Sequence, residues 1–144
     1  MRHSIGAASL GLATLALVAF IASSLGGAAP SQAEATGDAV KGKKIFARCG
    51  ACHSTDAGVN KVGPSLHGII GRPSGSIADF TYSDAMKNSH LTWDEATLDK
   101  YLTSPKKFAP GTKMAFPGLP KAQDRANLLR WLRDQSDSPV PLPQ

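Results

Sequence analysis

Cys49-Gly50-Ala51-Cys52-His53 is the stretch that decides how this chain folds. Two thiols three positions apart, followed at once by an imidazole, are typical of the attachment site of a c-type haem. Each thiol can add across one vinyl group as a thioether, and the spacing places both sulfurs along one edge of the porphyrin. His53 then falls beneath the iron as an axial ligand. The motif predicts one haem c, covalently attached through Cys49 and Cys52.

Two other uses of these thiols have to be weighed. A Cys-X-X-Cys redox dithiol normally lies at the turn from a strand to a helix, and no strand pattern precedes Cys49. A zinc site could take Cys49 and Cys52 with two of His53, His67 and His90, but His53 directly abuts Cys52, which is poor ligand spacing. Because the chain has only two cysteines, an all-cysteine zinc site and a separate disulfide are excluded. We favour haem attachment over both alternatives.

Residues 1–33 resemble a secretory signal peptide. They contain a short basic start at Arg2 and His3, an apolar run over residues 10–21, and small residues leading to a cleavage site after Ala33. Cleavage after Ala35 would also place two small residues, Ala33 and Ala35, at the spacing that a cleavage site requires.

An uncleaved membrane anchor is the alternative for this leader, since residues 5–29 carry no charge and are long enough to cross a bilayer. We favour cleavage, because the strongly apolar part is short for a span. Either way the globular part is exported. The predicted location is the periplasm, with anchoring to the periplasmic face of the inner membrane as the alternative.

The remainder is the size of one small domain, which we place at residues 34–137, followed by a proline-rich and disordered tail over residues 138–144. Without Arg2 the exported part has 15 basic and 11 acidic side chains, a formal charge of +4. So short a chain buries a modest core, and a haem would give its side chains a large apolar plate to pack around. The modest charge and the export argue against nucleic acid as a partner.

The predicted fold is all-α, with three main helices and long loops wrapped around the haem. Asp38 can cap a first helix, in which Gly42, Phe46 and Cys49 recur at helical spacing. Residues 54–83 are rich in Gly, Ser and Pro and read as a loop along the haem edge.

The two later helices have recognisable start signals. Residues 92–95, Thr-Trp-Asp-Glu, have the form of a capping box and open a helix that Pro105 ends. Pro120 opens the last helix, in which Leu128, Trp131 and Leu132 share a face.

Several further blocks extend the pattern far beyond the haem-binding motif. They are Gly-Asp at 37–38, Lys-Gly-Lys-Lys-Ile-Phe at 41–46, Gly-Pro-Ser-Leu-His-Gly at 63–68, Gly-Arg at 71–72, Phe-Thr-Tyr-Ser at 80–83, Leu-Thr-Trp at 91–93, Pro-Lys-Lys at 105–107 and Pro-Gly-Thr-Lys-Met-Ala-Phe at 110–116. In this order, and over nearly the whole exported part, they resemble a class I cytochrome c of the mitochondrial and alphaproteobacterial type.

The resemblance implies the remaining site residues. Met114 corresponds to the sixth iron ligand, presented by a tight Pro-Gly loop, and Pro64 to the residue whose carbonyl accepts the free ring N–H of His53. Three residues match positions that hydrogen-bond or neutralise a buried haem propionate: Arg72, Tyr82 and Trp93. Thr112 and Tyr101 match polar contacts near the methionine ligand and the inner propionate.

The function implied by the resemblance is one-electron transfer, with the haem iron cycling between ferric and ferrous states. Iron held by both His53 and Met114 has no open position for a substrate, so the protein is expected not to be an enzyme. Its expected partners are a cytochrome bc-type complex and a terminal oxidase or reaction centre. The protein is expected to be a monomer that docks onto acidic surfaces of these partners. The basic residues expected to face those surfaces are Lys44, Arg48, Lys61, Lys106, Lys107, Lys113 and Lys121.

Two other functions are kept as alternatives. A haem peroxidase or gas sensor would require Met114 to leave the iron easily, and the intact loop at residues 110–116 argues against this. A fixed electron-transfer subunit would require the leader to stay uncleaved.

Three residues outside the ligand set are given smaller roles. His67 is expected to brace its loop through hydrogen bonds, and His90 to lie exposed before a helix. Met86 stands where relatives often carry Asn, and we expect it to dry the site and shift the reduction potential modestly.

Overall fold

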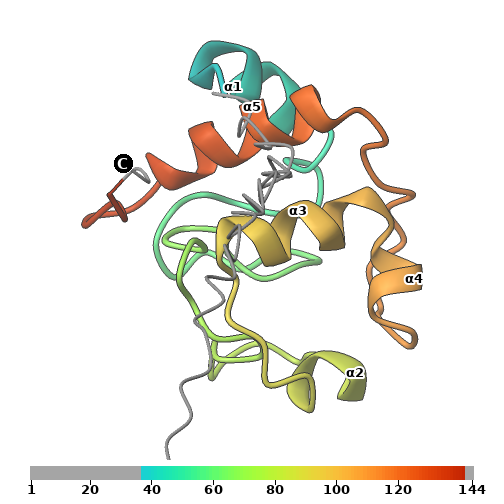
Figure 1. The fold of residues 1–144 in the computed structure, drawn as a ribbon. Helices are drawn as coiled ribbons and strands as arrows, with labels where there is room; N and C mark the ends of the chain where they lie inside the picture. Colours follow the sequence, from blue (N-terminus) through green and yellow to red (C-terminus); the bar gives the residue numbers. More distant parts are fainter. Residues whose placement is uncertain (1–36, 142–144) are drawn as a thin grey trace, which may run out of the picture. The chain divides into compact units, whose positions relative to one another are not determined.

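The computed structural model describes residues 37–141, which fold as helices and loops without a β-strand among them. This confirms the all-α class. The predicted leader and residues 142–144 of the predicted tail lie outside the described residues. Three longer helices match the prediction, and two four-residue helices are additional (Figure 1). The helices are α1 (Ala39–Phe46), α2 (Asp84–Lys87), α3 (Glu95–Thr103), α4 (Pro105–Phe108) and α5 (Ala122–Arg133).

The first and last helices pack against each other at close range (Figure 1). A Cβ atom at Gly42 of α1 would lie 2.0 Å from the carbonyl oxygen of Asn127 in α5, so only glycine permits this approach. The rings of Phe46 and Trp131 also pack together, with centroids 4.5 Å apart. Asp38 caps α1 as predicted, accepting hydrogen bonds from two backbone N–H groups of the first turn. This packing fixes the end of α1, where the haem-binding motif begins.

The start of α3 differs from the predicted capping box. Asp94, rather than Thr92, is the N-cap, and its carboxylate accepts a hydrogen bond from the backbone N–H of Thr97 at 2.7 Å. Thr92 is used elsewhere, because it forms an isolated antiparallel bridge with Pro73. That bridge ties the loop containing Arg72 to the start of α3.

The prolines also act slightly differently from the prediction. Pro105 does stop α3, but it occupies the first turn of α4, where its fixed φ suits a helix start. The last helix begins at Ala122, two residues beyond Pro120, with Lys121 in extended conformation at the N-cap.

Within residues 37–141, no helix combines the length and apolar character needed to span a bilayer.

The buried apolar side chains come mainly from α3, α5 and the loops beside them. They form one cluster that surrounds a central cavity. Its fully or nearly buried members are Ile69, Met86, Trp93, Leu98, Tyr101, Leu102, Ala109, Leu119, Leu128, Leu129 and Leu132.

Candidate haem site

A cavity of about 660 Å³ lies inside this cluster. Its walls are mostly apolar and its volume is in the range of small-molecule and cofactor sites. All eight residues predicted for the haem site line it, although they come from five separate segments of the chain. They are Cys49, Cys52, His53, Arg72, Tyr82, Trp93, Thr112 and Met114.

The two cysteines lie in a tight turn that continues from α1. The backbone N–H of Cys49 donates to the carbonyl of Phe46 at 2.7 Å, and that of His53 donates to the carbonyl of Cys49 at 2.9 Å. This winding brings both cysteines and the imidazole to the same cavity. Both thiols are free, and burial raises the pKa of Cys49, which disfavours its thiolate form.

The zinc alternative finds no support in the geometry. In the described part of the chain, no three His, Cys, Asp or Glu side chains come close enough together to hold a metal ion. His67 and His90 are therefore not gathered around the two cysteines.

His53 is held in one orientation by its surroundings. Its Nδ1 lies 2.7 Å from the carbonyl oxygen of Pro64, the hydrogen bond that was predicted. A carbonyl can only accept, so Nδ1 carries the proton and Nε2 keeps a free lone pair when the ring is neutral. Burial lowers the pKa of His53, which favours that neutral form. The imidazole is thus prepared to act as a nitrogen ligand.

Gly63 makes room for this ring. A Cβ atom at position 63 would lie 2.3 Å from Cε1 of His53, closer than any side chain could tolerate. No role was predicted for Gly63 from the sequence. The available signal was its position directly before Pro64, the residue expected to hold the ring.

Met114 reaches the cavity from the segment between α4 and α5. Its backbone N–H donates to the hydroxyl oxygen of Thr112 at 3.3 Å. The hydroxyl of Tyr101, on α3, lies 3.7 Å from the Met114 sulfur and 3.4 Å from Thr112 Oγ1. Burial raises the pKa of Tyr101, which keeps the phenol protonated and able to donate. The expected polar contacts around the thioether are therefore in place.

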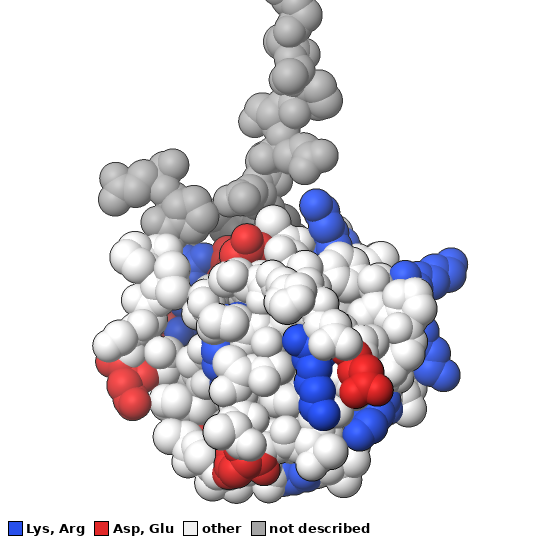
Figure 2. All heavy atoms as spheres, turned by 90° about the horizontal axis from the view of Figure 1, so that it is seen from below, with Lys and Arg blue, Asp and Glu red and all other residues white. Residues whose placement is uncertain are grey.

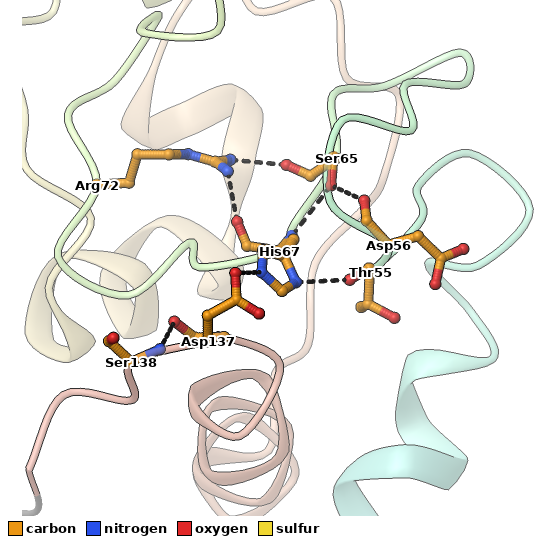
Figure 3. A network of polar contacts seen from close by, with 8 residues as sticks. Thr55, Asp56, Ser65, His67, Arg72, Asp137 and Ser138 are labelled. Atoms are coloured by element: carbon orange, nitrogen blue, oxygen red, sulfur yellow. Dashed lines mark hydrogen bonds and ion pairs between the residues drawn. The ribbon is translucent and has the colours of Figure 1, made fainter.

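Hydrogen bonds within the protein hold the Arg72 side chain in place. Its guanidinium donates to the carbonyl oxygens of His67 at 2.9 Å and Ser65 at 2.8 Å (Figure 3). Burial lowers the pKa of Arg72, but an arginine stays charged in proteins, so a cationic group remains at the cavity wall. These two bonds use only part of the five guanidinium N–H donors.

His67 braces the same loop, as predicted. Its Nδ1 lies 3.1 Å from the carbonyl oxygen of Thr55, and its Nε2 lies 3.3 Å from a carboxylate oxygen of Asp137 (Figure 3). Both partners are acceptors, so the ring satisfies both only when each nitrogen carries a proton. His90 is exposed and adopts a positive φ of 51°, also away from the cavity.

A second hollow, of about 960 Å³, lies between the region of α2 and the start of the Met114 segment. It is more open to solvent, and polar and apolar residues both line it. Of the eight predicted site residues it contains only Tyr82. No thiol, imidazole or thioether lines it, so the smaller cavity is the one suited to a haem.

The residues of the smaller cavity fit a covalently bound haem. Two thiols, a nitrogen donor and a thioether sulfur meet between apolar walls, with a cation nearby for a carboxylate. Some of the wall residues had no role predicted from the sequence, because their packing joins distant segments. Ile69 is an example, since its only sequence signal is that it is apolar.

Comparison with known proteins gives a consistent picture. The family model for cytochrome c matches residues 39–136. The chain is 54% identical to cytochrome c2 of Rhodoblastus acidophilus over 97 residues, which covers 67% of this chain and 91% of the relative. It is 48% identical to cytochrome c of Nigella damascena over 102 residues, which covers 69% of this chain and 92% of the relative.

A solved structure is similar as well. Cytochrome cH from Methylobacterium extorquens superposes with a TM-score of 0.64 and is 45% identical in sequence. The match covers 68% of this chain and 99% of that structure. Similarity in sequence and similarity in fold therefore point to the same family.

Proposed function

This chain belongs to the cytochrome c family and is an electron carrier with one covalently bound haem c, and we propose that it shuttles single electrons between membrane complexes. The donor would be a cytochrome bc-type complex and the acceptor a terminal oxidase or a photosynthetic reaction centre. The observation that carries the proposal is the meeting of Cys49, Cys52, His53 and Met114 at one cavity.

Four residues would hold the haem. Cys49 and Cys52 would form the two thioethers, and Nε2 of His53 and the sulfur of Met114 would ligate the iron. When bound, the haem supplies an iron that alternates between ferric and ferrous states. A neutral thioether favours the ferrous state, so Met114 would raise the reduction potential relative to a second imidazole.

The polar residues of the cavity would stabilise the propionates. A carboxylate taken out of water needs donors or a cation, since an unpaired buried charge is costly. Arg72 supplies the cation, and Tyr82, Trp93 and Thr112 supply further donors at the cavity wall. Trp93 is 7% exposed and lines the cavity, which supports its assignment.

With His53 and Met114 both serving as ligands, the iron would offer no site to a substrate. The proposed role is therefore electron transfer without enzymatic chemistry. The carbonyl of Pro64 accepts a hydrogen bond from His53, and the hydroxyl of Tyr101 donates to the sulfur of Met114. These two contacts would limit the movement of the ligands between oxidation states.

The surface charge suits docking by a monomer onto acidic partners. Basic side chains gather along one edge of the face in Figure 2, with acidic ones spaced between and beside them. Among the described residues, Lys106 and Lys107 lie exposed on α4, next to the Met114 segment. Positive charges near an exposed haem edge would steer acidic partners and make association slower at high salt.

We also propose that residues 1–33 direct export and are removed, leaving the protein in the periplasm. Mass spectrometry of the mature N-terminus would test this directly. A start near residue 34 or 36 is expected, and an intact leader would favour the tethered subunit instead.

An absorption spectrum of the purified holoprotein tests the main proposal. The oxidised form should show the weak red band of iron–methionine ligation, and Met114→Ala should lose it. A haem-loaded protein without that band, and with carbon monoxide binding at neutral pH, would favour the peroxidase or gas-sensor alternative.

A further inference from the structure

Arg48 and Phe116 meet at the haem cavity although they are far apart in the chain. The guanidinium carbon of Arg48 lies over the Phe116 ring, 5.3 Å from its centroid, and both residues line the cavity. A guanidinium within about 6 Å of a ring centroid makes a cation–π contact. Arg48 itself is exposed, whereas Phe116 is partly buried and packs against the core cluster.

This contact joins the two segments that carry the proposed ligands. Arg48 directly precedes Cys49, and Phe116 follows Met114 by two residues. A tie between their side chains therefore connects the thiol-bearing turn to the segment of the thioether.

The Met114 segment depends on such side-chain ties. Among the backbone hydrogen bonds of the described residues, none involves residues 113–118. Within the described part of the chain, the long-range polar contacts of Met114 are limited to the Tyr101 hydroxyl at its sulfur. The neighbouring Lys113 ammonium lies near the carbonyls of Thr81 at 3.4 Å and Tyr82 at 3.5 Å. A segment without a backbone ladder can move away from the cavity when one of its few contacts is lost.

We infer that Arg48 is a positioning residue, which holds Phe116 and thereby keeps Met114 at the iron. The inference rests on the proposed function, because it takes Met114 as the sixth ligand. Arg48 acts through the flat face of its guanidinium, and its charge alone is not sufficient. Loss of the contact would raise the population of the state in which Met114 has left the iron.

Imidazole binding to the ferric holoprotein measures that population, since imidazole takes the position that Met114 vacates. Arg48→Ala and Phe116→Leu should each increase the apparent imidazole association constant by about two- to fivefold. Arg48→Lys should lie between the wild type and Arg48→Ala, because an ammonium lacks the planar face. Lys43→Ala is the matched control: it removes one exposed charge from the last turn of α1 and should leave the constant unchanged.

The double variant Arg48→Ala/Phe116→Leu decides whether the two residues act through one contact. Its constant should equal that of Phe116→Leu, because without the ring Arg48 has no contact left to lose. If the fold-increase in the association constant of the double variant equals the product of the two single fold-increases, the inference is overturned. It is also overturned if Arg48→Ala binds imidazole as weakly as the wild type. If Arg48→Ala cannot be purified with haem, the cycle with Arg48→Lys and Phe116→Leu gives the same decision.

The red absorption band separates this inference from the proposed function. If the wild type shows the band, Met114→Ala loses it and Arg48→Ala leaves imidazole binding unchanged, the inference alone fails. If the band is absent from the wild type, or survives Met114→Ala, the ligand assignment fails and the inference fails with it.

Discussion

Gly63 lies directly against the imidazole of His53, with room for no more than a hydrogen where other residues carry Cβ. The carbonyl of the next residue, Pro64, accepts the hydrogen bond from Nδ1 of the same ring. The two neighbours together set both the position and the tautomer of the ring. His53 can therefore change its orientation only if this loop moves.

Gly63→Ala should displace either the ring or the loop. We expect the holoprotein to lose about 1–3 kcal/mol of stability, the usual cost of forcing extra volume into a packed site. Guanidinium denaturation of the ferric form measures the loss. The reduction potential should shift as well, because the hydrogen bond to Pro64 tunes the donor strength of the ring.

Gly50→Ala is the matched control for that change. Gly50 lies in the turn between the two cysteines, and its added Cβ would meet Phe46 at 3.5 Å, an ordinary van der Waals distance. Stability and potential should stay near the wild-type values. Equal effects of the two substitutions would show that the contact with His53 is not what limits position 63.

Asp94 should make α3 sensitive to acid. The backbone N–H of Thr97 donates to its carboxylate and lowers the pKa of Asp94 in the folded state. Because the pKa of Asp94 is lower in the folded than in the unfolded protein, its carboxylate stabilises the fold fully above the unfolded pKa of 3.8. That stabilisation is lost as the pH falls through the folded pKa. Asp94→Ala should therefore cost about 1 kcal/mol at neutral pH and progressively less below pH ~4.

Urea denaturation at several pH values would measure this difference. Asp94→Asn keeps an acceptor oxygen at the cap without a titrating group, so it should lie nearer the wild type than Asp94→Ala at neutral pH. Like Asp94→Ala, it should gain stability relative to the wild type as acid is added. A constant difference between wild type and Asp94→Ala from pH 7 to pH 3 would contradict the assignment.

Glu95 and Arg133 form an ion pair between the start of α3 and the end of α5. The Arg133 side chain is only 5% exposed, and its Nε and Nη1 have no hydrogen-bond partner among the described residues. Glu95→Ala would leave this buried cation without its carboxylate. We expect a loss of about 2 kcal/mol, below the cost of breaking a fully buried pair because Glu95 is partly exposed.

The double variant Glu95→Ala/Arg133→Leu should recover most of that stability, since an apolar side chain needs no partner. The comparison is Asp134→Ala, which breaks the more exposed pair with Arg130 on the surface of α5 and should change stability by less than about 0.5 kcal/mol. Thermal denaturation of the four holoproteins gives these differences. A double variant less stable than Glu95→Ala would contradict the argument.

Local chemistry made the haem attachment and the long helices predictable. The two cysteines and His53 are adjacent in sequence, and Asp38 caps the helix that starts next to it, so no distant residue was needed to recognise them. Thr92 shows the limit of this reasoning. Its pattern suits a helix cap, but pairing with Pro73, well before it in the chain, uses it in a loop bridge instead.

The cavity shows the same limit more strongly. Met114, Arg72, Tyr82, Trp93 and Thr112 could be assigned only through resemblance to a family, because nothing in their spacing shows that they meet. Contacts between side chains and distant loops could not be anticipated at all. The bonds from Arg72 to two loop carbonyls depend on how the loop closes, and so does the contact between Arg48 and Phe116.

Met86 gives the test most specific to this sequence. Its side chain is 8% exposed, lines the haem cavity and belongs to the core cluster, while its carbonyl accepts hydrogen bonds from the hydroxyls of Ser74 at 2.8 Å and Ser89 at 3.0 Å. These bonds hold the backbone in place, so a substitution changes mainly what the cavity wall offers. Met86→Asn would put an amide there, which costs stability unless water or another group pairs with it.

We therefore expect Met86→Asn to destabilise the holoprotein by about 1–3 kcal/mol and to shift its reduction potential, since the polarity around a haem tunes that potential. Met86→Leu keeps an apolar side chain of similar volume and should stay within about 1.5 kcal/mol of the wild type with little change in potential. Denaturation and potentiometric titration of the three proteins give both quantities. If Met86→Asn matches the wild type in stability and in potential, Met86 does not keep the site dry, because an unpaired amide in a dry cavity could not be neutral in both.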